Sequence, residues 1–263
     1  MKIFLKSIRF YFKYSWFNIK EQFSDLGSGI VGFLLFPFFI WLVARLWGRF
    51  NSYQGNYNFN EILLYVGATE ILFMTFLRPP SLARASGDFS LSLARPRSWV
   101  AMSFSGLFGR CLGARTVFIL LFLFIMPLLG VKLSLAFKVI NRLFLLLPLL
   151  GVFQALVSLL FASAQVLWTE TNYFILPVSK VFLALGGVFG PLVDFGEPWR
   201  TRLLFFPPAD VFFQPAHFCV KGEFYRMNPG QWLTRVLIIC TALGVLNFFF
   251  YRQARRYHQS FGG

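Results

Sequence analysis

The sequence predicts an all-α polytopic membrane protein, and three observations lead to this fold class. Hydrophobic residues make up 57% of the 263 residues and charged residues only 13%, whereas a soluble domain carries about 25% charged residues. The chain contains 37 Phe and 7 Trp, which excludes a disordered chain because such chains are poor in aromatic residues. One bilayer crossing takes about 20 apolar residues, so the chain can supply about five to seven helices. Little length is left for a catalytic domain, and we expect a single transmembrane domain over residues 1–263.

The charge balance also fits a membrane protein. The chain has 25 Lys and Arg against 10 Asp and Glu, a net charge of +15. In a soluble protein this excess would suggest a nucleic-acid partner, but in a membrane protein it marks cytoplasmic loops and attracts anionic lipid. We therefore expect contact with membrane lipid and none with nucleic acid. The 3 Cys show no paired spacing, so we expect neither a disulfide framework nor a metal site.

Residues 1–26 predict an amphipathic helix that lies in the membrane interface. Their cations fall within one narrow stripe at about 100° per residue, and apolar side chains fill most other positions. Such a helix rests on the membrane with its basic edge toward anionic headgroups. The alternative is the first turn of a longer membrane helix, but Gly27 and Gly29 interrupt the pattern before the next apolar run. The cations of the stripe are Lys2, Lys6, Arg9, Lys13 and Lys20.

Six apolar stretches predict six transmembrane helices. They cover residues 28–47, 61–77, 116–130, 143–169, 173–193 and 232–251. Cations between the third and fourth stretches predict a loop there, which contains Lys132, Lys138 and Arg142. More Lys and Arg lie on the side of the N-terminus than on the other side, and cytoplasmic loops are rich in these residues. We therefore expect both termini in the cytoplasm and the protein in a bacterial cytoplasmic (inner) membrane.

The longest predicted loop, residues 194–231, is apolar in its middle yet contains three prolines. Pro207, Pro208 and Pro215 argue against a straight crossing, because proline removes a backbone donor and breaks helices. A re-entrant segment before the last helix fits better, since irregular backbone at membrane depth has to be shielded by protein or face water. A distorted seventh span is the alternative.

Two ionisable residues lie inside predicted spans, where charge is costly and marks function by default. Glu70 lies near the middle of the second span and Lys180 about two turns into the fifth. They could pair across a helix interface, which would lower the cost of burying each. One interpretation places Glu70 on a polar pathway or a subunit interface. The other is a buried polar lock, or a Lys180 that extends to the inner surface. Glu61 and Arg235 lie at span ends, where charge costs little, and we assign them no role.

Motifs of familiar catalytic sites are absent from the sequence. The chain contains no GxxxxGK[ST], so it does not bind ATP through a P-loop, and neither HExxH nor GxSxG occurs. His217 and Cys219 are two candidate ligands, fewer than the three that a catalytic metal needs. We therefore expect no enzyme activity and no cofactor on this chain.

The predicted inner loop over residues 78–99 is the most informative stretch. It is too polar to span a membrane, too long for a tight turn, and combines several cations with Asp88. Ser86 or Asp88 can cap a short helix. A short cytoplasmic helix of this kind is a docking element for a soluble partner. The alternative is an ordinary basic loop that only sets the topology.

The layout resembles the membrane subunit of type-2 ABC exporters, and the resemblance covers nearly the full length. A basic amphipathic helix precedes the first span. Residues 87–96 (GDFSLSLARP) resemble the GxLDxxLxRP segment that follows the second span in one branch of this family, with Ser92 at a usually apolar position. The proline-bearing stretch 206–216 and the tail 257–263 (YHQSFGG) also resemble segments of that branch.

The resemblance implies a permease subunit of an ATP-driven exporter. A second permease subunit, identical or related, would complete the pathway, and two copies of a separate P-loop ATPase would hold ATP and Mg²⁺. Residues 194–231 would form an outer gate that includes Pro207, Pro208 and Pro215. Glu70 and Lys180 would lie on the pathway or between helices. Carried over onto this chain, the residues that couple to the ATPase are Gly87, Asp88, Leu91, Arg95, Pro96, Arg97 and, in a short inner turn, Glu170.

Three other function classes stay open. The transmembrane coupling subunit of energy-coupling-factor importers relies on Ala-Arg-containing helices, and this chain has such dipeptides at Arg84 and Arg95, although both lie in one compact loop. A polytopic membrane enzyme would need a convergent set of polar residues. The only candidates that cluster in the sequence are His217, Asp210 and Glu223. A secondary transporter would show inverted repeats, and we find none.

Overall fold

The computed structural model describes residues 10–19, 30–51, 57–74, 98–168 and 171–260. Throughout these residues the regular structure is helical, as predicted. The long helices are α2 (Ile30–Asn51), α3 (Phe59–Met74), α5 (Trp99–Leu128), α6 (Leu133–Leu167), α7 (Thr171–Leu185) and α10 (Pro229–Ser260). Shorter helices between α7 and α10 are η2 (Leu192–Asp194), α8 (Trp199–Leu204), η3 (Ala209–Phe213) and α9 (Gln214–Lys221).

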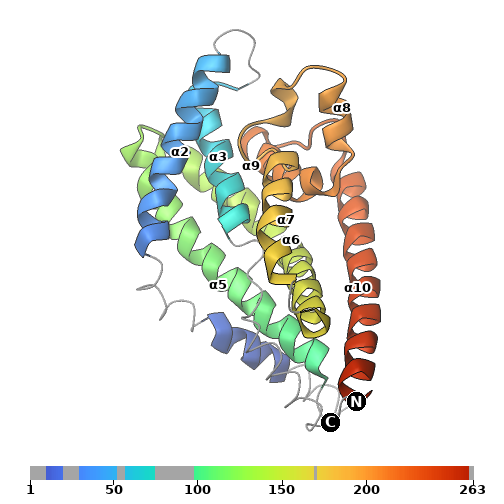
Figure 1. Ribbon diagram of the computed structural model, residues 1–263. Helices are drawn as coiled ribbons and strands as arrows, with labels where there is room; N and C mark the ends of the chain where they lie inside the picture. Colours follow the sequence, from blue (N-terminus) through green and yellow to red (C-terminus); the bar gives the residue numbers. More distant parts are fainter. Residues whose placement is uncertain (1–9, 20–29, 52–56, 75–97, 169–170, 261–263) are drawn as a thin grey trace.

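The long helices alternate in direction along the chain (Figure 1). Residues 186–228, which we call the return segment, leave α7 and join α10 at the same end of the bundle, which we call the return end. The helix of residues 10–19 and the C-terminal part of α10 lie at the opposite end (Figure 1). The return segment therefore covers one end of the bundle without crossing to the other.

Three helices are long and apolar enough to cross a membrane, by length and composition. They are α5, α6 and α10. The apolar stretches described in α2 and α7 are shorter, at Phe36–Leu46 and Tyr173–Leu185, and α3 has 16 residues. These findings support a helical membrane protein. The number of six spans and their orientation stay predictions.

The structure corrects three predicted boundaries. α6 begins at Leu133, so the predicted loop is limited to residues 129–132, which include Lys132, and Lys138 and Arg142 lie within a helix. α5 begins at Trp99, well before the predicted start at residue 116. α7 ends at Leu185 rather than near residue 193. A turn that contains Gly187, with a φ of +71°, follows directly after Leu185. In α5 and α6 the prediction was wrong because it ended a span at cations. These helices continue past their cations, and backbone carbonyls accept hydrogen bonds from the buried Arg115 and from the partly buried Arg142.

Arg115 shows how α5 accommodates a buried cation. The residue is fully buried, and its guanidinium donates to Leu147 O at 3.1 Å and to Leu150 O at 3.3 Å, both in α6. These carbonyls belong to residues on either side of Pro148, which lies inside α6. Hydrogen bonds to a charged donor are stronger than neutral ones. Arg115 therefore joins α5 to the part of α6 around Pro148.

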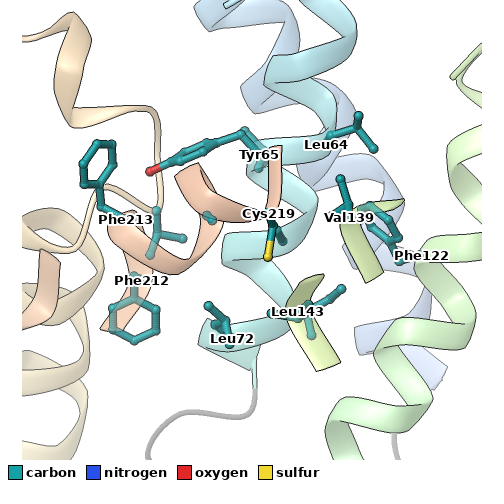
Figure 2. Packing of buried hydrophobic residues seen from close by; sticks show 14 of the residues in the cluster. Leu64, Tyr65, Leu72, Phe122, Val139, Leu143, Phe212, Phe213 and Cys219 are labelled. Carbon is teal, nitrogen blue, oxygen red and sulfur yellow. The ribbon is translucent and has the colours of Figure 1, made fainter. Parts of the chain in front are cut away.

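α3 is the central helix of the fold. Every residue from Ile62 to Leu72 is buried, and the helix packs against α2, α5 and α9. Figure 2 shows Leu64 and Leu72 of α3 in one hydrophobic cluster with Phe122 of α5, Leu143 of α6 and residues of η3 and α9. Most buried polar side chains in proteins have a hydrogen-bond partner, so the polar residues of this helix depend on groups inside the protein.

The predicted interfacial helix over residues 1–26 is described for residues 10–19, which lie against the first half of α5. Ser15 Oγ donates to Ser105 O at 2.7 Å, and Arg110 Nε donates to Asn18 Oδ1 at 3.1 Å. Gly109 of α5 lets the two backbones approach closely. The side chains that remain exposed on this short helix include large apolar ones, namely Phe12, Trp16 and Phe17.

We predict that Gly109→Ala detaches the helix of residues 10–19. An added Cβ would collide with the backbone of Ser15. Gly244→Ala is the matched control, because nothing lies within 4 Å of a Cβ there and both changes gain about 1 kcal/mol of helix propensity. Hydrogen exchange over residues 10–19 should become several-fold faster in the Gly109 variant only. Equal exchange in both variants would contradict the close contact.

Candidate functional site

A polar stripe on α3 holds the return segment. Tyr57, Glu61, Tyr65 and Thr69 recur at every fourth residue, and residues spaced in this way share one face of a helix. Tyr57 lies just before α3 begins at Phe59. Each of the four side chains contacts the return segment, and we call the set the α3 stripe.

Glu61 and Lys221 form an ion pair that ties α3 to α9. Lys221 Nζ lies 2.8 and 2.9 Å from the two carboxylate oxygens of Glu61. Asn58 N donates to the same carboxylate at 2.9 Å, and Glu61 N donates to Asn58 Oδ1 at 2.9 Å. This reciprocal pair is a capping box at the start of α3. The Lys221 ammonium also lies 4.8 Å from the centre of the Tyr57 ring, in range of a cation–π interaction. Glu61 is therefore both a helix cap and an ion-pair partner.

His217 of α9 is a neutral anchor between aromatic rings. The Tyr57 hydroxyl forms a hydrogen bond with its Nδ1 atom, and the rings of Phe213 and Tyr225 lie with their centres 5.6 Å from the imidazole. Burial and then the charge of Lys221 lower the pKa of His217 to about 4, against an opposite effect of Glu61. The imidazole is therefore uncharged near pH 7 and holds the segment by its hydrogen bond.

The second half of the α3 stripe fixes the beginning of the return segment. The Tyr65 hydroxyl donates to Gly187 O at 2.7 Å, and Thr69 Oγ1 lies 3.4 Å from Val188 O. Gly187 has a φ of +71°, in the region that glycine adopts at little cost. The α3 stripe therefore reaches both the turn that follows α7 and the helix α9.

The three prolines predicted for the gate shape one short helical run over residues 207–221, which contains η3 and α9. Pro207 and Pro208 begin the run, where no backbone donor is needed. In η3 the Gln214 N–H donates to Ala209 O, and Pro215 follows in the first turn of α9. At about 1.5 Å per residue the run is about 22 Å long, less than the hydrocarbon core of about 30 Å. The run is therefore shorter than a straight crossing needs, and a re-entrant segment and a distorted span both stay predictions.

Arg142 of α6 caps the C-terminal end of α9. Its Nη1 atom donates to Cys219 O at 3.0 Å and to Val220 O at 3.1 Å. A cation is favourable here because the last carbonyls of a helix have no partner within it. Gly222 ends the helix with a φ of +92°, and a Cβ on this residue would lie 2.6 Å from Arg142 Nη2. The positive φ favours glycine here, and a larger residue would in addition have to displace the guanidinium from its carbonyl partners.

α10 supplies the remaining anchors. Arg235 Nη2 lies 3.1 Å from Asp210 Oδ2, and Trp232 Nε1 donates to Asp210 O at 2.8 Å. Burial raises the pKa of Asp210 to about 6, and Arg235 opposes this shift. Within the segment, the buried Gln214 side chain donates to Tyr225 O at 3.1 Å and accepts from Tyr225 N at 2.9 Å. These two hydrogen bonds join α9 to the part of the return segment that follows it.

Glu70 and Lys180 lie in different environments. Glu70 is 1% exposed, and among the described residues neither of its carboxylate oxygens has a hydrogen-bond partner. Lys180 is exposed on α7, and no ion pair joins it to Glu70 within the described part of the chain. The ATPase-coupling residues predicted from the sequence lie outside the described residues. They are Gly87, Asp88, Leu91, Arg95, Pro96, Arg97 and Glu170.

The polar residues considered for an enzyme do not converge. His217 bonds Tyr57, Asp210 pairs with Arg235, and Glu223 is exposed. Over the residues that the structure describes, no three His, Cys, Asp or Glu side chains are arranged to hold a metal ion. What the arrangement can do is hold a short helical segment against α3, α6 and α10 through charged and polar contacts.

Sequence reasoning assigned no role to Glu61 and Arg235, yet both form ion pairs with the return segment. Two signals in the sequence point to Glu61. It follows Asn58 at the spacing of a capping box, and it belongs to a set of polar residues at four-residue spacing in an apolar stretch. Arg142 has no comparable signal, because its partners are backbone carbonyls of a distant segment.

We predict that Gly222→Ala destabilises the protein more than Gly130→Ala does. Both glycines have positive φ, +92° and +85°, so both substitutions carry the same kind of backbone strain, about 1–2 kcal/mol. Only at Gly222 does the added methyl group displace the Arg142 guanidinium, since nothing lies within 4 Å of a Cβ at Gly130. Thermal unfolding in detergent measures the difference, and equal losses would contradict the Arg142 cap.

We predict that His217 makes the stability depend on pH. The unfolded histidine has a pKa of about 6.5, so the unfolded state takes up the proton first as the pH falls. The stability that the neutral His217 contributes is present above pH 6.5 and lost progressively toward pH 4, by up to about 3 kcal/mol. Thermal unfolding of the wild type and of His217→Gln from pH 4.5 to 7.5 tests this. Parallel curves would show that His217 does not titrate in this way.

No protein-family model matches this chain, and a search of curated proteins finds no match either. A proposal for the function of this chain therefore rests on its own sequence and on the geometry of its residues.

Proposed function

We propose that this chain is the permease subunit of an ATP-driven ABC exporter in a bacterial cytoplasmic membrane. The observation that carries the proposal is the course of the chain. Long helices alternate in direction, and the return segment enters and leaves at one end directly before α10 (Figure 1). The helix of residues 10–19 lies against α5 at the opposite end. The sequence resemblance to type-2 ABC exporters implies this same order of elements.

α3 provides a mechanical connection between the two ends. The chain runs from its C-terminal end directly into residues 78–99, where the proposed coupling helix lies, and the α3 stripe holds the return segment. Packed helices move as units rather than deform continuously. We expect the partner ATPase to close on ATP and Mg²⁺ and to displace the coupling helix. The resulting movement of α3 would strain the contacts of Glu61 and Tyr57 with α9 and open the return end.

Glu70 and Lys180 are the proposed charged groups of the pathway. A buried carboxylate without a hydrogen-bond partner is costly, and charged residues inside membrane helices mark function by default. Lys180 is exposed on α7, where it is accessible to a second permease subunit or to the substrate. The second subunit, identical or related, would supply the other half of the pathway.

Co-purification from the native host tests the proposed function. The tagged chain is extracted in mild detergent, and the mass of the intact complex is measured together with ATP turnover. We expect two permease subunits with two copies of a P-loop ATPase. A complex without an ATPase in several detergents would reject the exporter. A complex with a separate membrane protein that binds the substrate would favour the importer alternative.

We predict that Asp88→Ala and Arg95→Ala uncouple the permease from its ATPase. Removal of either charge should lower the amount of co-purified ATPase several-fold, because charged contacts at a docking surface contribute strongly when desolvated. Membrane insertion should stay normal. Arg256→Ala is the control, an exposed cation in the last part of α10. Unchanged ATPase recovery in both coupling variants would reject the role of residues 87–97.

A further inference from the structure

A cavity of about 550 Å³ opens at the return end between the start of α3, the first turns of α6 and the end of α9. Leu64, Val139 and Val220 supply apolar surface inside it, while Asn60 and Lys138 supply polar groups. The mechanism proposed above uses none of these five side chains. The cavity is therefore a second site that needs its own explanation.

The charge of the cavity favours an anion. Glu61 lines the wall, but its carboxylate is already bound by Lys221 and by Asn58 N. Lys138 also lines the cavity and is exposed, and it has neither an ion pair nor a hydrogen bond to any described residue. The wall thus carries one unbalanced positive charge, with the side-chain amide of Asn60 as a further donor.

The surroundings of the cavity favour a lipid over a small soluble anion. Phe59 and Leu135 line it and are partly exposed large apolar side chains. Exposed apolar side chains at the mouth of a cavity are suited to contact with the acyl chains of a lipid. A phosphate ion would satisfy Lys138 but leave most of the volume and the apolar wall empty, and pockets of this size hold larger ligands.

We propose that this cavity binds a phospholipid from the leaflet at the return end. Its phosphate would contact Lys138, and the first part of an acyl chain would lie along Leu64, Val139 and Val220. A Lys ammonium forms charge-assisted hydrogen bonds with phosphate oxygens. The proposal does not depend on the exporter assignment, because it follows from the cavity and its charge alone.

Such a lipid would stabilise the present arrangement of the three elements reversibly. The cavity wall comes from three elements, α3, α6 and α9, and a ligand that contacts all three binds best when they keep their present arrangement. A ligand that binds one state stabilises that state by mass action. Bound phospholipid would therefore favour the arrangement in which the return segment is held against α3.

Lipid retention by the purified full-length chain tests the proposal. Native mass spectrometry measures binding of phosphatidylglycerol, which carries a net negative charge, to the wild type and to Lys138→Gln. We expect about tenfold weaker binding in the variant, the factor that one charge-assisted hydrogen bond contributes. Lys132→Gln is the matched control, an exposed lysine directly before α6 that does not line the cavity, and its binding should equal that of the wild type.

Two further measurements separate a lipid from other occupants. Leu135→Trp fills the apolar part of the cavity from a partly exposed position and should also weaken phosphatidylglycerol binding several-fold. Inorganic phosphate at millimolar concentration should not displace the lipid. Equal binding by the Lys138 and Lys132 variants would overturn the proposal. Full displacement by inorganic phosphate, or unchanged binding in Leu135→Trp, would instead assign the cavity to a soluble anion and would likewise overturn it.

Discussion

The enclosure of α3 is the constraint on which the rest of the structure depends. A helix buried on all sides cannot leave polar groups to water, and a buried donor or acceptor without a partner costs about 1–3 kcal/mol. Tyr57, Glu61, Tyr65 and Thr69 all lie on one face of this helix or its start. The return segment supplies the partners of this face through His217, Lys221 and the carbonyl of Gly187, whereas Thr69 donates within α3, to Val66 O at 2.9 Å.

The return segment also needs hydrogen-bond partners, since it is a short helical run with many buried backbone groups. Arg142 satisfies the carbonyls at the end of α9, and Trp232 satisfies the Asp210 carbonyl. Gln214 closes the segment on itself at Tyr225. These partners belong to α6, to α10 and to the segment itself. Because α3 also contacts the return segment, a movement of α3 would change the contacts of this segment with α3, α6 and α10. Such shared contacts are what the proposed exporter would need from a helix that connects its two ends.

Composition was sufficient to predict a helical membrane protein, and the apolar run over residues 143–169 located most of α6. The three prolines correctly indicated that residues 203–220 do not form a straight span. The starts of α5 and α6 could not be predicted, because Arg115 and Arg142 are held by carbonyls that only the tertiary structure brings near. Glu61 could have been recognised from its capping box with Asn58, whereas its ion pair with Lys221 joins residues 160 positions apart. The coupling residues near Asp88 lie outside the described part of the chain, so their role stays a prediction.

The proposed exporter requires the two ends of the bundle to face opposite sides of the membrane, with the return end outside. Cysteine labelling in intact cells measures this, and the background is low because Cys111, Cys219 and Cys240 are buried. Glu223→Cys places a thiol at an exposed position of the return segment, and Gln253→Cys places one on the exposed surface of α10 near the opposite end. A membrane-impermeant maleimide should label the first in intact cells and the second only after permeabilisation. Labelling of both from outside, or of Gln253→Cys alone, would contradict the account.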